Sequence, residues 1–346
     1  MAKTETLFPI LDSNPLVGLA RTAAGAELDS TGCLTEYRPL PSRSIVNKTV
    51  SKRGLPFTHA INPYRGCEFG CRYCYARYTH EFLELQPDEF ERKIYFKQNA
   101  AWLLKQELQR LKPGTEIAIG TATDSYQPLE RKLGITRSLL EVFAQTGGFK
   151  LSIITKSALI TRDLDVLKNV ARANQLSVSI TVTTTDRRLA RLLEPRAPRP
   201  DLRIKALAEL RSAGIRAGVN CAPLLPGITD LRSSIDAVAS AAAAAGACYM
   251  FAGALFLKPC SLPTFFAFVR EHFPQQLVAY ERRYGSSAFV SAEYRKRMQE
   301  LVESIRAKYK LGSRYLPNSD YQDAFVDDMP FGEAQPWLPF AQVSSL

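Results

Sequence analysis

Short apolar runs rich in β-branched residues alternate with longer helix-like patterns through the middle of the chain. We expect strands over residues 57–63, 116–121, 150–155, 176–183, 218–222 and 248–256. Helices are expected between them over residues 99–111, 136–145, 164–173, 201–213 and 230–245. Repeated strand–helix units favour a mostly parallel sheet with helices outside it. A right-handed series of this length curls into a barrel or part of one, and the loops after its strands meet at one rim, where we expect the chemistry.

Composition divides the 346-residue chain into three parts. Residues 1–55 are rich in Pro, Ser, Gly and Thr with weak periodicity, so we expect an extended N-terminal arm. Residues 56–262 carry the strand–helix pattern. Residues 263–346 are the predicted C-terminal extension, with helices over 262–272 and 292–309 that cover the open edge of the barrel, and a tail over 320–346 that folds over the active rim.

The net charge of +11 makes a polyanionic or phosphorylated substrate plausible, and the basic residues are densest over 38–53 and 187–203. A merely basic protein without such a substrate is the alternative. The longest apolar stretch, residues 237–245, is far too short to span a bilayer, so we expect no membrane association. The N-terminus lacks the pattern of a signal peptide, which favours a cytoplasmic location.

Three of the seven cysteines, Cys67, Cys71 and Cys74, directly follow the first expected strand. The spacing C-x3-C-x2-C lets one short loop place three thiolates around one face of an iron–sulfur cluster, whose ligands are normally cysteines. With three ligands, one iron stays open to chelate a small molecule through an amine and a carboxylate. A structural zinc with a distant fourth ligand is the alternative, although the paired knuckles usual for zinc are missing from the sequence.

The segment INPYRGCEFGCRYCYAR, from Ile61 to Arg77, resembles the signature of the radical S-adenosylmethionine (SAM) superfamily. The segment also looks like the branch of that superfamily related to spore photoproduct lyase, often labelled DNA-repair-photolyase-like. The resemblance continues through IAIGTATDSYQPLER, LSIITKSALITRDLDVL, SITVTTTDRRLARLLEPRAP and GVNCAPLLPGITD, and spans roughly residues 40–310. It implies an α/β fold with a partial (β/α)6 TIM-like barrel. It also implies a [4Fe–4S] cluster on Cys67, Cys71 and Cys74 that cleaves SAM reductively, and an electron donor of the flavodoxin or ferredoxin type.

The resemblance further implies residues that contact SAM. Tyr73 would pack on the cluster and the adenine, with a plain core aromatic as the alternative. Gly120, Thr121 and Asp124 follow the second strand, where the superfamily meets the SAM amino group, although G-T-A-T-D here replaces G-G-E and a polar loop without ligand contact is the alternative. Lys156 would pair with the SAM carboxylate unless it is simply solvated. Ser179 and Thr181 share one strand face and would bond the ribose or carboxylate, with ordinary strand hydroxyls that contact no ligand as the alternative.

One departure concerns the hydrogen donor. Spore photoproduct lyases carry a donating cysteine just after the second strand, and residues 120–124 contain none. Cys221, at the end of the fifth strand, is the cysteine expected on the rim and therefore a candidate donor, with a small buried cysteine as the alternative. Tyr75, just past the cysteine motif, is a candidate radical relay.

These features predict a radical SAM enzyme whose 5′-deoxyadenosyl radical abstracts hydrogen from a substrate. The first hypothesis is that this substrate is a nucleic acid. The same chemistry on a peptide or small metabolite is the second hypothesis, since fold does not decide the substrate. A zinc-stabilised nucleic-acid-binding protein is the third.

Overall fold

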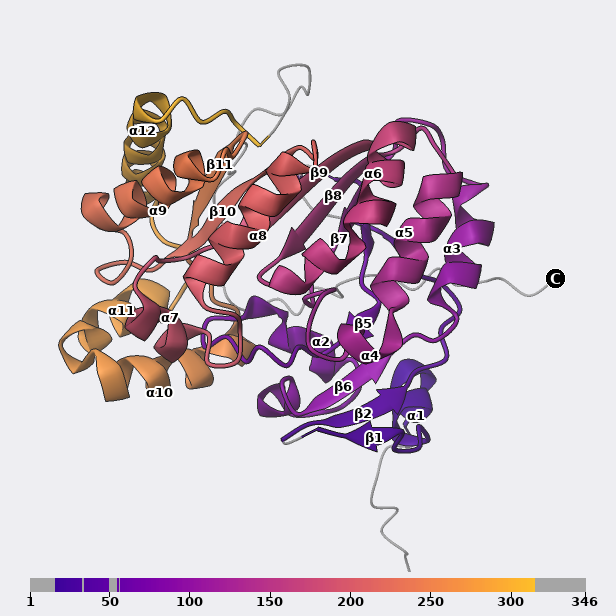
Figure 1. The fold of residues 1–346 in the computed structure, drawn as a ribbon. Helices are drawn as coiled ribbons and strands as arrows, with labels where there is room; N and C mark the ends of the chain where they lie inside the picture. Colours follow the sequence, from indigo (N-terminus) through magenta and orange to yellow (C-terminus); the bar gives the residue numbers. More distant parts are fainter. Residues whose placement is uncertain (1–15, 33, 50–54, 56, 315–346) are drawn as a thin grey trace, which may run out of the picture.

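The computed structural model describes residues 16–32, 34–49, 55 and 57–314, so the tail predicted over 320–346 lies outside the described residues. Their main feature is a seven-stranded sheet of order β11-β10-β9-β8-β7-β4-β3 (Figure 1). The strands are β3 (Val46–Lys48), β4 (His59–Ile61), β7 (Glu116–Ile119), β8 (Lys150–Thr155), β9 (Gln175–Thr181), β10 (Ala217–Leu224) and β11 (Met250–Ala254). Neighbours from β4 to β11 are parallel, and β3 runs antiparallel to β4. Strands β4 and β7 to β11 are the predicted six.

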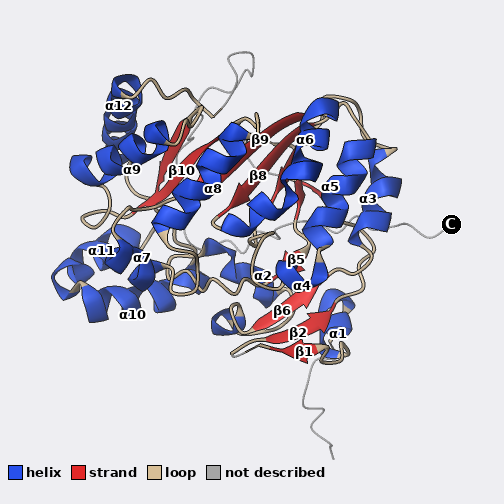
Figure 2. Ribbon diagram, in the orientation of Figure 1, coloured by secondary structure: helices blue, strands red, loops and turns tan. Residues whose placement is uncertain are grey.

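Helices cover the outer face of this sheet (Figure 2). They are α3 (Ala100–Leu108), α5 (Ile135–Gln145), α6 (Leu164–Ala173), α8 (Pro200–Ser212) and α9 (Arg232–Ala244). Each follows a strand and buries one apolar stripe; in α9 the stripe is Ile235, Val238, Ala239 and Ala242, at helical spacing. The central strand β7 is buried on both faces, as is usual inside a parallel sheet. The predicted partial (β/α)6 barrel is therefore confirmed.

The C-terminal region is helical, as predicted, with α10 (Leu262–His272), α11 (Leu277–Tyr284) and α12 (Ala292–Lys308). Helix α12 packs against β11, the last strand of the sheet. Just after α12, Gly312 pairs with the same edge: Met250 N donates to Gly312 O at 3.2 Å, and Gly312 N donates to Cys248 O at 3.0 Å. The C-terminal region thus covers an otherwise open sheet edge.

The sequence predicted an extended arm over residues 1–55, but the described part of this segment forms regular helices and strands. These are α1 (Gly18–Ala24), β1 (Ser30–Thr31) and β2 (Glu36–Pro39), in addition to β3. Strands β1 and β2 join β5 (Tyr64–Arg65) and β6 (Lys93–Phe96) in a small sheet of order β1-β2-β6-β5. Strands of two to four residues are too short to show a recognisable periodicity. In addition, β2 and β5 pair with β6, which lies far along the chain. The division into three domains stays a prediction.

The remaining elements are short and were not predicted. They are the helices α2 (Tyr78–Glu81), α4 (Glu130–Leu133) and α7 (Arg187–Leu193), and 3-10 turns at Tyr75–Arg77, Pro87–Glu89, Ala158–Asp163, Pro259–Ser261 and Pro274–Gln276.

Candidate functional site

The three motif cysteines lie on one tight loop between β5 and the turn at Tyr75–Arg77. Gly66 starts this loop with φ of +83°, and a Cβ there would lie 2.8 Å from the carbonyl oxygens of both Phe90 and Lys93. Glycine is therefore required at this close approach. Cys67 N donates to Phe90 O at 3.0 Å, and Cys74 N donates to Cys71 O at 3.2 Å, which folds the loop back on itself.

A cavity of about 500 Å³ opens at the carboxyl ends of the strands, between the cysteine loop and α12. Most of the predicted site residues line it: Cys67, Cys71, Tyr73, Cys74, Tyr75, Gly120, Thr121, Asp124, Lys156 and Thr181. These residues come from four segments far apart in sequence. The structure therefore brings together the predicted cluster loop and most of the predicted SAM contacts on one rim, where a parallel α/β fold places its ligands.

In the cysteine loop, Cys67 and Cys71 are buried and Cys74 is partly buried. Burial raises the pKa of all three cysteines, to about 12 for Cys71, where the nearby Lys156 offsets part of the effect. Metal binding at such thiols displaces their protons. In the described part of the chain, no three His, Cys, Asp or Glu side chains converge on a single ion. The ligands of a [4Fe–4S] cluster lie further apart than those of a single ion, because each thiolate binds a different iron. Three sulfur donors on one short loop fit that cluster.

The loop after β7 is fixed to the end of β8. Gly120 has φ of +85°, and a Cβ there would lie 2.7 Å from Ile154 O. Asp124 is buried, and its carboxylate accepts hydrogen bonds from the Thr155 hydroxyl at 2.6 Å and the Lys156 amide at 2.7 Å. Thr121 Oγ1 accepts from the Asn62 side chain at 3.2 Å. These bonds hold the polar edge of the cavity in one shape.

Lys156 and Tyr73 lie side by side at the cavity wall. The Lys156 Nζ lies 5.6 Å from the centre of the Tyr73 ring, which favours a cation–π contact. Burial alone would lower the pKa of Lys156, but Cys71 and the Glu194 carboxylate more than offset it and raise the pKa. Lys156 therefore presents a permanent positive charge to the cavity, as an anionic ligand group requires.

Ser179 and Thr181 have different surroundings. Thr181 lines the cavity, and its Oγ1 accepts from the Asn220 side chain at 3.4 Å. Ser179 is fully buried beneath it, with its hydroxyl 3.1 Å from the Tyr249 hydroxyl, and it is not among the described residues that line the cavity. The two residues share a strand face, but Tyr249 covers the deeper one.

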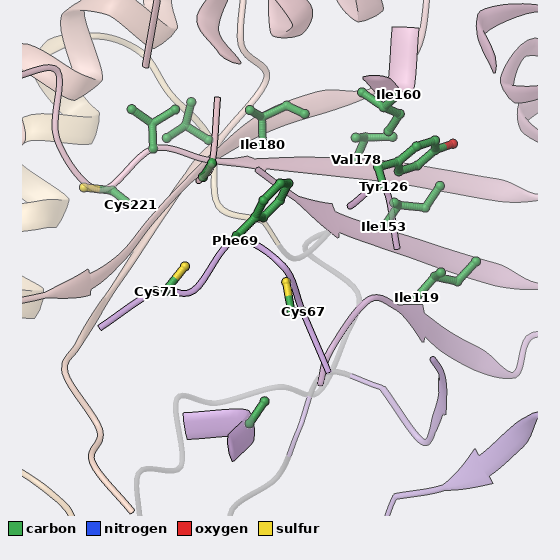
Figure 3. Close-up of a cluster of buried hydrophobic side chains, with 14 of the residues drawn as sticks. Cys67, Phe69, Cys71, Ile119, Tyr126, Ile153, Ile160, Val178, Ile180 and Cys221 are labelled. Atoms are coloured by element: carbon green, nitrogen blue, oxygen red, sulfur yellow. The ribbon is translucent and has the colours of Figure 1, made fainter. Parts of the chain in front are cut away.

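The structure does not bring Cys221 to the cavity. Asn220 and Ala222 line the cavity, whereas Cys221 lies between them on the opposite strand face, 1% exposed and packed in the core. Figure 3 shows Cys221 on a separate strand from the loop of Cys67 and Cys71. Burial raises the pKa of its thiol to about 12. Strand alternation is the physical reason for this difference from the predicted rim position.

Tyr75, the predicted relay, lies in the cavity and is 39% exposed. Its hydroxyl donates to the carbonyl oxygen of Thr121, on the loop after β7. Its ring centre lies 5.8 Å from that of Phe256. Tyr75 therefore bridges the cysteine loop and the far wall of the cavity.

Sequence reasoning missed the side chains that support the cysteine loop. Glu68, inside the loop, accepts from the Tyr37 hydroxyl at 2.8 Å and the Leu129 amide at 3.0 Å. Glu194, which directly follows α7, accepts a hydrogen bond from the Tyr73 hydroxyl. Helix α12 also supplies an unpredicted wall, including Met298, Val302 and Arg306. The only signal in the sequence was the acidic residue next to the first cysteine.

No helix in the described part of the chain combines the length and the apolar character needed to cross a bilayer.

Comparisons with known proteins agree with this site. The family model of the radical SAM superfamily matches residues 61–236. An uncharacterized protein of Mycobacterium tuberculosis is 31% identical over 303 residues, covering 87% of this chain and 88% of that protein. An uncharacterized protein of Methanocaldococcus jannaschii is 30% identical over 173 residues, covering 50% of this chain and 62% of that protein.

Solved structures of spore photoproduct lyase share the fold. The lyase complexed with dinucleoside spore photoproduct gives a TM-score of 0.62 at 14% identity over 80% of each chain. A mutant of the lyase with bound AdoMet and the same dinucleoside gives 0.59 at 14% identity, over 76% of this chain and 77% of that chain. The superfamily match spans half of this chain and includes the cysteine loop and the strands β7 to β10. The chain therefore belongs to the radical SAM superfamily and is an enzyme of radical chemistry.

Proposed function

We propose that Cys67, Cys71 and Cys74 hold a [4Fe–4S] cluster and that SAM binds beside it in the cavity. The observation that carries this proposal is the single cavity of about 500 Å³ that these cysteines share with Gly120, Thr121, Asp124, Lys156 and Thr181. When bound, the cluster supplies an electron for reductive cleavage of SAM, and the resulting 5′-deoxyadenosyl radical abstracts hydrogen from the substrate. Membership of the superfamily argues against the zinc-stabilised binding protein.

The residues of the chain bind and orient SAM. Lys156 offers its ammonium group to the SAM carboxylate, while the loop at Gly120 and Thr121 presents its backbone to the amino group. Thr181 offers a hydroxyl to the ribose. Ser179 supports this edge from below through Tyr249 and makes no direct contact in this proposal. Tyr75, whose hydroxyl faces the loop after β7, is the residue proposed to relay hydrogen.

We propose nucleic acid as the substrate class. The far wall of the cavity combines the aromatic rings of Phe256 and Phe289, stacked 4.6 Å apart, with Arg295 and Arg306 of α12. The buried Nε of Arg306 has no hydrogen-bond partner among the described residues. Aromatic rings beside guanidinium groups suit unstacked bases and their phosphates. The net charge of +11 favours the same substrate over a neutral metabolite.

The decisive experiment is anaerobic reconstitution with iron and sulfide, followed by dithionite and SAM. The expected result is a brown protein that releases 5′-deoxyadenosine, and a Cys71→Ala variant that does neither, with Cys221→Ala as the matched control that does both. A colourless protein that binds one zinc and leaves SAM intact would contradict the proposal. A flavodoxin or ferredoxin, the proposed cytoplasmic donor, should replace dithionite in the same assay.

The substrate class has its own test. We expect oligonucleotide affinity to fall steeply as salt rises, since phosphate contacts release counterions. Arg306→Gln should flatten that slope. Binding that is absent or insensitive to salt would favour the peptide or small-metabolite substrate.

A further inference from the structure

A buried carboxylate lies directly behind the cysteine loop. The hydroxyl of Tyr73 donates to Glu194 Oε1, and Thr183 Oγ1 donates to the same oxygen at 3.1 Å. Arg203 Nη2 lies 2.5 Å from Glu194 Oε2, and the two side chains are 1% and 0% exposed. The chain encloses this ion pair in the wall behind the cysteines, where charges interact strongly.

The segment that carries Glu194 is fixed to the loop through its backbone as well. Arg72 N donates to Leu193 O at 2.9 Å, and Arg196 N donates to Phe69 O at 3.3 Å. These bonds join the end of α7 and the connection that follows it to the residues on either side of Cys71. Any shift of the Glu194 segment therefore moves the loop.

The polarity of the pair follows from its contacts. The carboxylate contacts the cysteine loop through the Tyr73 hydroxyl. The other Arg203 donors bind Pro198 O at 2.7 Å and Thr181 O at 3.1 Å, and neither acceptor belongs to the cysteine loop. The loop therefore faces the negative end of the pair. Fixed charge next to an iron–sulfur cluster is one of the factors that set its reduction potential.

We propose that Glu194 is a positioning residue that fixes Tyr73 and lowers the reduction potential of the cluster held by the neighbouring cysteines. The proposal rests on the cluster ligation proposed above. Glu194 neither touches SAM nor reacts. It holds the loop in register with the cavity, and its negative charge, kept in place by Arg203, disfavours addition of an electron to the cluster.

The fold contains a matched control at a different place. The hydroxyl of Tyr64 donates to Glu130 Oε2, and Arg162 Nη2 lies 3.0 Å from Glu130 Oε1. Glu130 is fully buried like Glu194, and it accepts further bonds from the amides of Thr136 and Arg137. This second group joins a tyrosine, a buried glutamate and an arginine without contacting the Cys67–Cys74 segment through the glutamate. It separates a general loss of stability from an effect on the cluster.

The test compares reconstituted full-length wild type, Glu194→Gln and Glu130→Gln. We expect Glu194→Gln to raise the midpoint potential of the cluster, to change the electron paramagnetic resonance spectrum of the reduced protein, and to release iron to a chelator several-fold faster. Glu130→Gln should lower the melting temperature but leave the potential and the spectrum as in wild type. Equal potentials in all three proteins would overturn the proposal.

A second pair of variants covers the case in which Glu194→Gln does not fold. Tyr73→Phe removes only the hydroxyl link and keeps the buried charge, with Tyr64→Phe as its control. We expect several-fold faster iron loss in Tyr73→Phe alone, and equal rates in the two variants would count against positioning. A wild-type protein that takes up no cluster would contradict the proposed function itself. Failure of the proposed function is therefore distinguishable from failure of the role proposed for Glu194, which would show as a loaded wild type with properties equal to those of the variants.

Discussion

The Gly120→Ala substitution tests whether the edge of the cavity depends on one backbone conformation. A left-handed alanine costs about 1–2 kcal/mol relative to glycine. The new Cβ at Gly120 would also lie 2.7 Å from the backbone oxygen of Ile154, which belongs to a buried parallel strand. Overpacking of this kind typically lowers the free energy of unfolding by another ~1–3 kcal/mol. We therefore expect a total loss of about 2–5 kcal/mol for Gly120→Ala.

Gly134→Ala is the matched control. Gly134 has φ of +63° between α4 and α5, and a Cβ there would meet nothing within 4 Å. The Gly134→Ala variant should lose only about 1–2 kcal/mol of unfolding free energy, which is the cost of the left-handed backbone alone. Urea denaturation of the apoproteins measures both losses, with equal m-values required for the comparison. Equal losses in the two variants would refute the argument that the approach to Ile154 requires glycine at position 120.

Three further predictions concern single side chains. Lys156→Met should weaken SAM binding to the reconstituted protein about 10- to 100-fold, the effect of losing one charge-assisted contact, and calorimetry measures this affinity. The variant should keep its iron. Unchanged affinity would show that Lys156 does not contact SAM. Burial, aided by Arg65, lowers the pKa of Lys97 to about 7, so the unfolded chain binds a proton that the folded chain lacks between pH 7 and 10.5, and stability should rise with pH across that window. Lys97→Met should abolish this rise and stabilise the protein below pH 7 by at most about 5 kcal/mol, as measured by thermal melts at each pH. If stability still rises with pH in the variant, a group other than Lys97 is responsible. Tyr75→Phe should leave cluster uptake and SAM cleavage intact but stop solvent deuterium from reaching the product, and retained label would exclude Tyr75 as the relay.

The strand–helix order and the cysteine loop could be predicted because both depend on local sequence. A strand such as Lys150–Thr155 shows its buried apolar run in the residues themselves, and the motif spacing places three thiols together whatever the rest of the chain does. The helix α9 was recognisable for the same reason, since its apolar stripe repeats at helical spacing.

The supporting contacts could not be predicted, because they depend on how distant segments meet. Glu194 sits next to a proline and an arginine, and nothing local distinguishes a helix cap from a partner of Tyr73. Cys221 was expected on the rim because its strand ends there, but strand alternation turns its side chain to the core. The small sheet of β1, β2, β5 and β6 was not predicted because each strand is short and because β2 and β5 both pair with β6, far along the chain.

The separation between Tyr73 and Glu194 has a consequence for how the site is made. The first support of the cysteine loop, Glu68 with Tyr37, joins residues 31 positions apart, whereas the second joins residues 121 positions apart. Contacts of long range form later, because the closure of a large loop is entropically expensive. During synthesis the loop emerges well before its rear wall exists. We therefore expect the nascent loop to stay accessible from one side until α8 has left the ribosome, which gives the machinery that delivers iron and sulfide a period in which to act.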